Sequence, residues 1–268
     1  MKVTGTLALV TGASSGIGAA TARELAREGA RVLLLARTRE ALDRVAREIT
    51  DAGGSAKVHS VDLADAPAVQ QAASAIQAES GTPDILVNGA GAGRPLFTEE
   101  TSPAEAAQMI AVPYLGAFNL TRAFLPDMIR RRRGHIVNVS SVAAFFAVPG
   151  MTGYTAARWA MRGFTEALRQ DLHGTGVGVT LVAPGLVSGT GYYEHNPGTA
   201  ERVPKAARLY PTLTTQQLAA AIVRGIERNK REVGMGLRYR LTAILWAVFP
   251  WPVNWVMRAT GWNRATSR

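Results

Sequence analysis

The chain has 268 residues, of which 47% are hydrophobic and 19% charged, and it contains no cysteine. This length and balance fit a globular protein with one large α/β domain or two small ones, and the missing cysteines exclude disulfides, thiolate metal sites and cysteine nucleophiles. The formal net charge of +10 raises nucleic acid, an anionic membrane or a phosphorylated ligand as partners.

Short apolar runs alternate with helical patterns along most of the chain. Apolar runs of this kind are typical of strands buried on both faces of a parallel sheet, and repeated βα units with right-handed crossovers build a doubly wound sheet. We therefore expect a single-domain α/β protein, a Rossmann-type doubly wound parallel sheet with helices on both faces. The expected strands are residues 7–11, 31–36, 57–61, 84–88, 135–140 and 177–183, and the expected helices are residues 16–28, 39–52, 66–79, 103–132, 153–173 and 215–229.

A glycine-rich loop, TGASSGIG at residues 11–18, joins the first expected strand to the first helix. A strand, a glycine turn and a helix in this order point free backbone N–H groups and the positive end of the helix dipole at a phosphate. Gly12 permits the tight turn, Gly16 lets the backbone approach a ligand, and Gly18 allows close packing of the helix on the strand. The loop therefore predicts nucleotide binding in preference to an ordinary glycine turn.

Four consecutive arginines at residues 130–133 form the densest basic run. They end an expected helix just before a strand, where cations complement the negative end of the helix dipole. Few aromatic residues lie beside them, and no nucleic-acid-binding motif is present. We expect no nucleic-acid partner and no metal site. The N-terminus lacks a long apolar core before the glycine loop, so we expect no signal peptide.

Residues 186–212 break the alternating pattern with many glycines and prolines. A long irregular segment in a compact domain is typical of a lid or binding loop, and an apolar wall beside it would suit a mostly apolar substrate. Ordinary packing of the phenylalanines and a surface position for the histidine are the alternatives. The residues expected in this substrate wall are Phe145, Phe146, Tyr192, Tyr193 and His195.

The C-terminal segment is the least ordinary part of the sequence, because four of the five tryptophans lie in the last 23 residues. Residues 241–257 are apolar and flanked by arginines, but Pro250 and Pro252 interrupt them, which makes a poor transmembrane helix. One interpretation is an interfacial segment on an anionic leaflet, since tryptophan and arginine suit that boundary. The other is a flap over the substrate pocket or a contact with a neighbouring subunit.

The motifs, in their order, resemble those of the short-chain dehydrogenase/reductase superfamily over about residues 5–230. The glycines of the first loop match its nucleotide loop. The stretch NGAG at residues 88–91 is similar to the family's Asn-Asn-Ala-Gly, with glycine in place of the second asparagine. The stretch NVSS at residues 138–141 ends the fifth expected strand, and Tyr154 follows its last serine by the family's 13 residues. The pair PG at residues 184–185 ends the sixth.

The resemblance implies that Tyr154 exchanges a proton with the substrate while Ser141 binds the carbonyl oxygen. The family has a lysine four residues after the tyrosine, but this sequence has Arg158, which shares a helix face with Tyr154. Arginine keeps the positive charge but cannot readily release a proton. Pro113 stands where the family has an asparagine, and it should kink its helix. Both departures affect the family's proton relay, and the predicted catalytic residues are Ser141, Tyr154 and Arg158.

Cofactor preference is predicted from the end of the second strand, where NAD-preferring relatives usually carry an acidic residue. Here Ala36 is followed by Arg37, whose guanidinium can bind a 2′-phosphate in a bidentate manner, so NADP(H) is favoured over NAD(H). Asp62 resembles a residue that contacts the adenine; a cap for the helix near residue 66 is the alternative. The predicted cofactor-binding residues are Gly12, Ser14, Ser15, Gly16, Ile17, Gly18, Arg37, Asp62, Leu63, Asn88, Gly89, Ala90, Tyr154, Arg158, Pro184, Gly185 and Val187.

Three functions are compatible with these residues. The leading hypothesis is an NADP(H)-dependent oxidoreductase that interconverts a carbonyl and an alcohol on a mostly apolar small molecule. The second is a redox-silent cyclase, isomerase or dehydratase on the same scaffold, with Tyr154 as acid/base. The third is a non-catalytic NADP(H)-binding protein that acts through its partners.

The family domain is expected over residues 1–237, including the substrate loop, with an extension at residues 238–268. By resemblance, the extension is expected to be a flap or subunit contact rather than a membrane segment. The helix that carries Tyr154 has a small-residue face at Ala156, Ala157, Ala160 and Gly163, and the family commonly pairs this helix across a dimer interface. We expect a homodimer or homotetramer in the cytoplasm, with peripheral membrane contact through the extension as the alternative.

Overall fold

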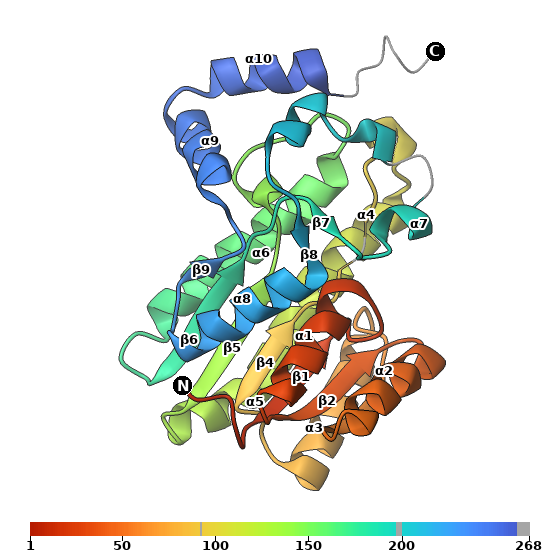
Figure 1. The fold of residues 1–268 in the computed structure, drawn as a ribbon, viewed down its shortest axis with the longest axis vertical. Helices are drawn as coiled ribbons and strands as arrows, with labels where there is room; N and C mark the ends of the chain where they lie inside the picture. The colour runs from red at the N-terminus through yellow and green to blue at the C-terminus, as the bar shows by residue number, and fades with distance from the viewer. Residues whose placement is uncertain (92, 197–199, 262–268) are drawn as a thin grey trace.

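The computed structural model describes residues 1–91, 93–196 and 200–261, except for the side chains of Tyr193 and His195. The main sheet has seven parallel strands in the order β3-β2-β1-β4-β5-β6-β9 (Figure 1). Its strands are β1 (Leu7–Thr11), β2 (Arg31–Ala36), β3 (Ser55–Ser60), β4 (Ile85–Asn88), β5 (Gly134–Val139), β6 (Val177–Val182) and β9 (Glu232–Val233).

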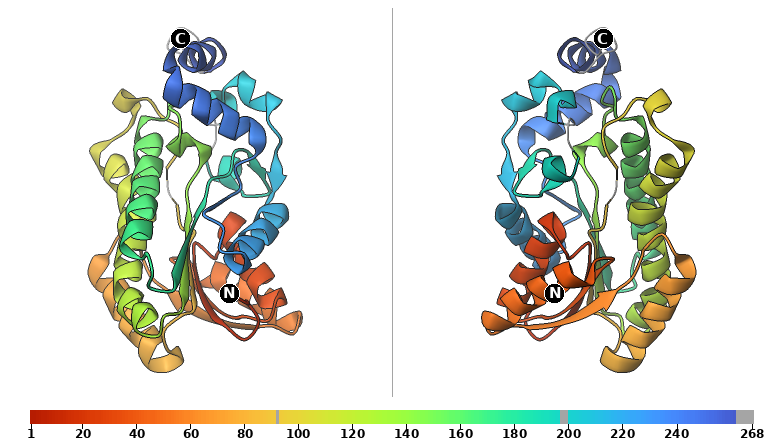
Figure 2. Two further views of the ribbon diagram at one scale, coloured as in Figure 1. Left: turned by 90° about the vertical axis from the view of Figure 1, so that its left-hand side faces the viewer. Right: turned by 90° about the vertical axis from the view of Figure 1, so that its right-hand side faces the viewer.

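Helices cover both faces of the sheet, as the two side views in Figure 2 show. Helices α1, α2 and α8 bury their apolar residues in a core on one face, and α3, α5 and α6 do so on the other. The helices are α1 (Gly16–Arg27), α2 (Arg39–Asp51), α3 (Ala66–Ser80), α4 (Pro103–Ile110), α5 (Gly116–Arg130), α6 (Thr152–Asp171), α7 (Tyr192–His195), α8 (Thr215–Glu227), α9 (Leu237–Val248) and α10 (Pro250–Thr260).

The central strands are buried on both faces because their side chains are apolar at nearly every position. All residues of β1, β4 and β5 are buried. Strand order changes direction at β1, from which the chain crosses first to β2 and β3 and later to β4. Such a switch point opens a crevice at the carboxyl ends of the strands. The predicted fold class is confirmed.

The expected long helix at residues 103–132 is wrong in one respect, because the structure divides it into two helices. A π-helical turn, Ala111–Leu115, separates α4 from α5, and the buried Pro113 lies at its centre. Proline lacks the N–H that an α-helical turn would use, so the backbone widens, and the amide of Gly116 donates to the carbonyl of Ala111. The kink predicted at Pro113 takes this form.

The segment after β6 is more ordered than its composition predicts. It contains β7 (Val187–Ser188), α7, and two short 3₁₀ helices, η4 (Ala200–Arg202) and η5 (Lys205–Leu209). Strand β7 pairs in parallel with β8 (Leu213–Thr214) in a second, two-stranded sheet. These elements lie above the carboxyl ends of the main strands (Figure 1).

The C-terminal extension forms two helices, α9 and α10, beyond the same edge of the sheet (Figure 1). Aromatic contacts attach α9 to the domain: the rings of Tyr239 and Tyr210 stack with centroids 4.2 Å apart, and Trp246 meets Trp159 of α6 edge-on at 5.8 Å. The tryptophan at position 262 lies outside the described residues. No described helix is long and apolar enough to cross a bilayer.

Candidate active site

A cavity of about 660 Å³ opens at the carboxyl ends of the parallel strands. It is lined by the glycine loop after β1, the ends of β2, β4, β5 and β6, the start of α6 and the segment around α7. Every predicted catalytic or cofactor-binding residue lines this cavity except Asn88. The fold therefore brings together residues that the sequence separates by more than 170 positions.

The glycine loop has the geometry that its spacing predicts. Gly12 has a φ of +66°, and a Cβ built there would lie 2.8 Å from the Cα of Ala90. A Cβ at Gly18 would overlap the carbonyl oxygen of Gly12, so α1 packs against the loop more closely than any other residue would allow. Gly16 also has a left-handed φ, +52°, and its backbone lines the cavity.

The N-terminus of α1 opens into the cavity without a side-chain cap. Ser15 is the N-cap residue, but its side chain makes no capping bond, and the first turn contains no acidic residue. The first N–H groups of a helix need acceptors, and the helix dipole favours a negative charge beside them. This end of α1 can therefore receive an anionic group.

Sequence analysis missed Thr11, which holds two sides of the cavity together. Its Oγ1 accepts hydrogen bonds from the amides of Gly89 and Ala90 at 3.0 and 3.1 Å. The loop after β4 is thereby fixed against the end of β1. The available signal was a hydroxyl residue placed directly before Gly12 at the end of a buried strand.

Asn88 needs a correction, because its side chain supports the site from below rather than lining it. It is 3% exposed, and its amide donates to the Oδ1 of Asn138 at 2.8 Å. The amide of Asn138 in turn donates to Thr165 of α6 at 3.0 Å. This chain of side-chain bonds joins β4, β5 and α6 beneath the cavity floor.

Two acidic residues near the third strand have different roles. Asp65 is the N-cap of α3 and accepts from the amide of Ala68, whereas Asp62 accepts locally from Ala64 and lines the cavity. The capping interpretation of Asp62 is therefore wrong. Arg37 also lines the cavity, is exposed, and makes no ion pair with any residue that the structure describes.

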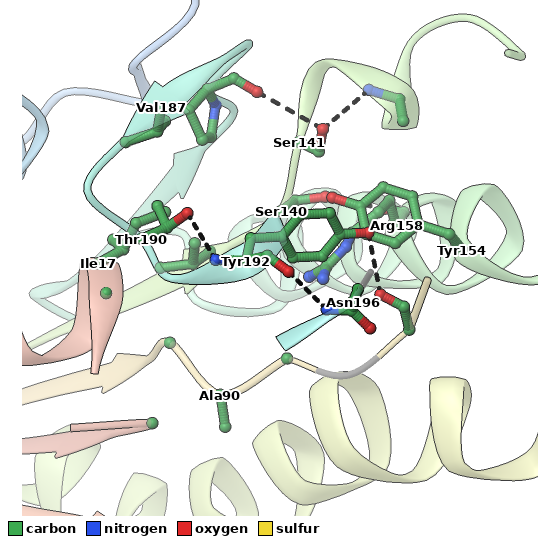
Figure 3. Close-up of a pocket in the computed structure, with 18 of the residues that line it drawn as sticks. Ile17, Ala90, Ser140, Ser141, Tyr154, Arg158, Val187, Thr190, Tyr192 and Asn196 are labelled. Carbon is green, nitrogen blue, oxygen red and sulfur yellow. Dashed lines mark hydrogen bonds between the residues drawn. The ribbon is translucent and has the colours of Figure 1, made fainter. Parts of the chain in front are cut away.

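Helix α6 places Tyr154 and Arg158 on one face, one turn apart, and both side chains line the cavity with Ser141 (Figure 3). The guanidinium carbon of Arg158 lies 4.6 Å from the centroid of the Tyr154 ring. Ser141 follows β5 and accepts from the amide of Ala143 at 3.2 Å, while its hydroxyl lies 3.5 Å from the carbonyl oxygen of Pro184. The hydroxyl is therefore held only weakly and faces the cavity.

Arg158 is a buried cation, 8% exposed. Its Nε has no hydrogen-bond partner, and none of the described carboxylates forms an ion pair with its guanidinium. A Cβ built on Gly91 would lie 2.9 Å from its Nη2, so the guanidinium rests against the backbone of the loop after β4. Buried charges without partners are costly, and such groups concentrate at functional sites.

The substrate wall is partly as expected. Phe146 and Tyr192 line the cavity, and the hydroxyl of Tyr192 donates to the carbonyl of Gly93 at 3.1 Å. Phe145 does not line it and instead packs beneath the guanidinium of Arg162, 4.0 Å from the ring centroid. The side chains of Tyr193 and His195 lie outside the described residues. Further apolar residues that were not expected from the sequence also line the cavity, among them Val148, Met151, Tyr239 and Met257.

The family model described as short chain dehydrogenase matches residues 6–198. The chain belongs to the short-chain dehydrogenase family. A fatty acyl-CoA reductase of Acinetobacter baylyi is 31% identical over 269 residues, which cover 98% of this chain and 86% of the relative. "Probable oxidoreductase EphD" of Mycobacterium bovis is 39% identical over 202 residues, 73% of this chain. The match covers 34% of that relative, so the chain spans about a third of its length.

Solved structures show the same relationship. A metagenomic short-chain oxidoreductase in complex with NADP superposes with a TM-score of 0.73 at 36% identity, covering 88% of this chain and 98% of that one. A short-chain dehydrogenase/reductase from Burkholderia phymatum in complex with NAD superposes with a TM-score of 0.82 at 28% identity, covering 92% and 95%. The described chain therefore has the fold of the short-chain dehydrogenase family.

Proposed function

We propose that the chain interconverts a carbonyl and an alcohol on a mostly apolar small molecule, with NADP(H) as cofactor, Tyr154 as acid/base and Arg158 in the place of the family's lysine. The observation that carries this proposal is the grouping of Ser141, Tyr154 and Arg158 in one cavity, with the buried guanidinium 4.6 Å from the tyrosine ring centroid.

The residues present fit NADP(H). The uncapped end of α1 and the left-handed Gly12 and Gly16 form a cradle for a pyrophosphate. Arg37 supplies a cation with no described ion-pair partner at the end of β2, where a 2′-phosphate would lie. The solved relatives that hold NADP or NAD support a nicotinamide cofactor. When bound, this cofactor donates or accepts the hydride.

The chain's own residues supply the proton chemistry. Tyr154 gives its hydroxyl proton to the carbonyl oxygen in reduction and takes it back in oxidation. The hydroxyl of Ser141 donates to the same oxygen and orients it. Arg158 places a fixed positive charge against the ring on which negative charge develops. The guanidinium lines the cavity, where its N–H groups can donate to a ribose hydroxyl.

Arg158 and Pro113 together separate this site from the relay that the family resemblance implies. A guanidinium does not pass a proton at neutral pH, and the buried Pro113 offers no side-chain donor or acceptor. We propose that Arg158 acts by charge and hydrogen bonding alone. The proton that Tyr154 needs then comes from water in the cavity.

Phe146, Val148, Met151 and Met257 support an apolar substrate, because they form the part of the cavity wall nearest the extension. A few polar groups on an otherwise apolar wall are enough to orient a ligand, and the rest of that ligand can be apolar. The hydroxyls of Ser141 and Tyr154 are among the polar groups that line this cavity.

The experiment that tests the proposal follows the absorbance of reduced nicotinamide while the protein is supplied with a panel of aldehydes and ketones. Loss of absorbance with equimolar alcohol formation is the expected result. Product formation without nicotinamide oxidation would select the redox-silent enzyme. Tight NADPH binding with no turnover of any substrate would select the non-catalytic protein.

We also propose that the chain forms a homodimer or homotetramer through α5 and α6. Leu115 and Phe118 are 45% and 42% exposed, and Phe118 packs against Phe164 of α6 with centroids 5.8 Å apart. Exposed aromatic and aliphatic side chains on adjacent helices are typical of subunit contacts. Light scattering of the purified chain gives the number of subunits.

A further inference from the structure

The outward face of α9 and α10 is apolar and largely exposed in the described chain. It is called the tail face here. Side chains on this face project at intervals of three and four residues along α9, and two exposed tryptophans follow at the same spacing on α10. Its main residues are Leu237, Leu241, Ile244, Val248, Trp251 and Trp255, which are 72%, 57%, 61%, 62%, 72% and 69% exposed.

The opposite face of the same helices already belongs to a core. Tyr239 of α9 and Val253 and Met257 of α10 are buried in a cluster with Phe146 and Leu181. This buried cluster holds α9 and α10 in place, and the exposed side chains of the tail face are not part of it. Contiguous apolar patches of this size on soluble domains mark interaction sites.

Several basic residues lie on or next to the elements that carry the tail face. No aspartate or glutamate follows Glu232 in the sequence. Arg240 pairs with Glu232 at 3.0 Å, and Arg238 donates to the carbonyl of Leu209 at 2.5 Å. Arg258 is exposed on α10. Lys205 and Arg208 add two further exposed cations on η5, which contacts α10.

We propose that the tail face docks on an anionic lipid surface. Exposed tryptophans on an apolar face with a cationic border match the boundary between acyl chains and anionic headgroups. Helices α9 and α10 have 12 and 11 residues, which is too short to cross a bilayer. In the docked state they would lie along this boundary. A second copy of the chain fits less well, because a two-fold contact through this face would bring its cations together with no acidic partner from the same segment.

Docking in this orientation would bring lipid close to the substrate end of the cavity. Tyr239 and Met257 lie on the inward sides of α9 and α10 and line the cavity. Figure 1 shows the two helices beyond the carboxyl edge of the sheet, with α2 and α3 in the opposite half of the molecule. If the proposed reductase function is also correct, the substrate reaches the site from the membrane; the docking itself does not depend on that function.

The test is flotation of the full chain with vesicles of phosphatidylcholine alone or with added phosphatidylglycerol. The chain should float with the anionic vesicles and not with the neutral ones. Trp251→Ser/Trp255→Ser should lower the partition coefficient at least about tenfold, since two large apolar side chains no longer enter the lipid. Arg258→Gln should lower it about fivefold. A matched control on another face is Arg47→Gln on α2, which should float like the parent chain.

A second measurement avoids variants altogether. Brominated acyl chains in the anionic vesicles should quench the native tryptophan fluorescence, because Trp251 and Trp255 enter the acyl boundary. Equal flotation of the parent chain and the double tryptophan variant, or no quenching, would overturn the proposal. A change of oligomeric state in that variant, measured by light scattering, with no flotation of the parent chain would assign the tail face to a second copy and would also overturn it.

Discussion

The two ends of the parallel sheet satisfy their polar groups in different ways. At the amino end, the ring Nε2 of His135 lies 2.8 Å from the Oγ1 of Thr180, whose hydroxyl donates to the carbonyl of Lys230 at 2.6 Å. Asp84 at the same end accepts from the amide of Leu7 at 3.0 Å and pairs with an arginine, Arg131, at 3.3 Å.

At the carboxyl end, several groups lack partners within the chain. Arg158 is buried with an unpartnered Nε, Arg37 has no described ion pair, and the side chain of Ser15 does not cap α1. Buried polar groups in folded proteins are nearly always paired, so the unpartnered Arg158, together with the exposed Arg37 and the uncapped end of α1, indicates where a ligand binds. We therefore expect substitutions at the carboxyl end of the sheet to change activity, and substitutions at the amino end to change stability.

The largest effect is expected from Tyr154→Phe at the carboxyl end. Removal of the hydroxyl eliminates the proposed acid/base group, so kcat should fall by about 10²- to 10⁴-fold. The melting temperature and NADPH affinity should remain close to those of the parent chain, because the Tyr154 hydroxyl makes no hydrogen bond to any described residue that would be lost. Steady-state kinetics and calorimetry check both halves of the expectation. Unchanged turnover would separate Tyr154 from the chemistry.

The next effect is the pH dependence of stability at the amino end. Burial, together with the charge of the N-terminal ammonium, lowers the pKa of His135 to about 4. The unfolded chain therefore binds a proton at higher pH than the folded chain does. The free energy of unfolding should fall as the pH decreases from the usual histidine pKa of about 6.5 to about 4, by up to about 3 kcal/mol from this residue.

The matched variant for this effect is His135→Gln, which keeps an N–H donor for Thr180 but does not titrate. Urea unfolding at a series of pH values should give a smaller slope for the variant than for the parent chain. Turnover at neutral pH should be the same for both, since His135 does not line the cavity. Identical slopes would show that the ring is protonated in the folded protein.

A smaller effect is expected when the charge at the end of β2 is reversed. Arg37→Asp removes a bidentate donor and places a carboxylate near the proposed 2′-phosphate position. The ratio of kcat/KM with NADPH to that with NADH should fall by roughly tenfold to a hundredfold, from charge-assisted hydrogen bonds of about 1.5–3 kcal/mol. Arg39→Asp provides a comparison, because Arg39 already faces Asp43 at 3.6 Å. Equal ratios in all three proteins would contradict the preference for NADP(H).

The smallest effect, and the one most specific to the comparison, is expected from Arg158→Met. The substitution removes a buried cation whose Nε lacks a partner, so the free energy of unfolding of the cofactor-free chain should rise by roughly 1 kcal/mol. NADPH affinity should fall at the same time. The exposed Arg47→Met on α2 should change neither by more than about 0.5 kcal/mol. A less stable Arg158→Met chain would mean that this cation is satisfied within the protein.

Much of the fold could be predicted because the central strands are almost wholly apolar. The expected ranges for β1 and β2 coincide with the observed ones. Strand β3 begins at Ser55 instead of residue 57, because it is an edge strand whose start is set by pairing with Arg31. Strand β9 has two residues and no periodicity, so only its pairing with β6 defines it.

The residues of the site also differ in how far the sequence predicts their positions. Positions fixed by backbone geometry, such as Gly12 and Gly18, could be predicted because no other residue fits there. The position of Arg158 over the Tyr154 ring could not, because it depends on which rotamer the loop at Gly91 allows. The contribution of α10 to the cavity through Met257 depends on a long-range contact that no local pattern encodes.

The most direct test of the account is isotope transfer from NADPH carrying deuterium on its transferable position. With a carbonyl substrate found in the panel, mass spectrometry should detect one deuterium on the carbinol carbon of the alcohol, with one NADPH consumed for each alcohol formed. The Tyr154→Phe chain should show the same transfer at a much lower rate. Product that carries no deuterium, or that forms without consumption of NADPH, would contradict the claim that Ser141, Tyr154 and Arg158 form an NADP(H)-dependent carbonyl–alcohol site.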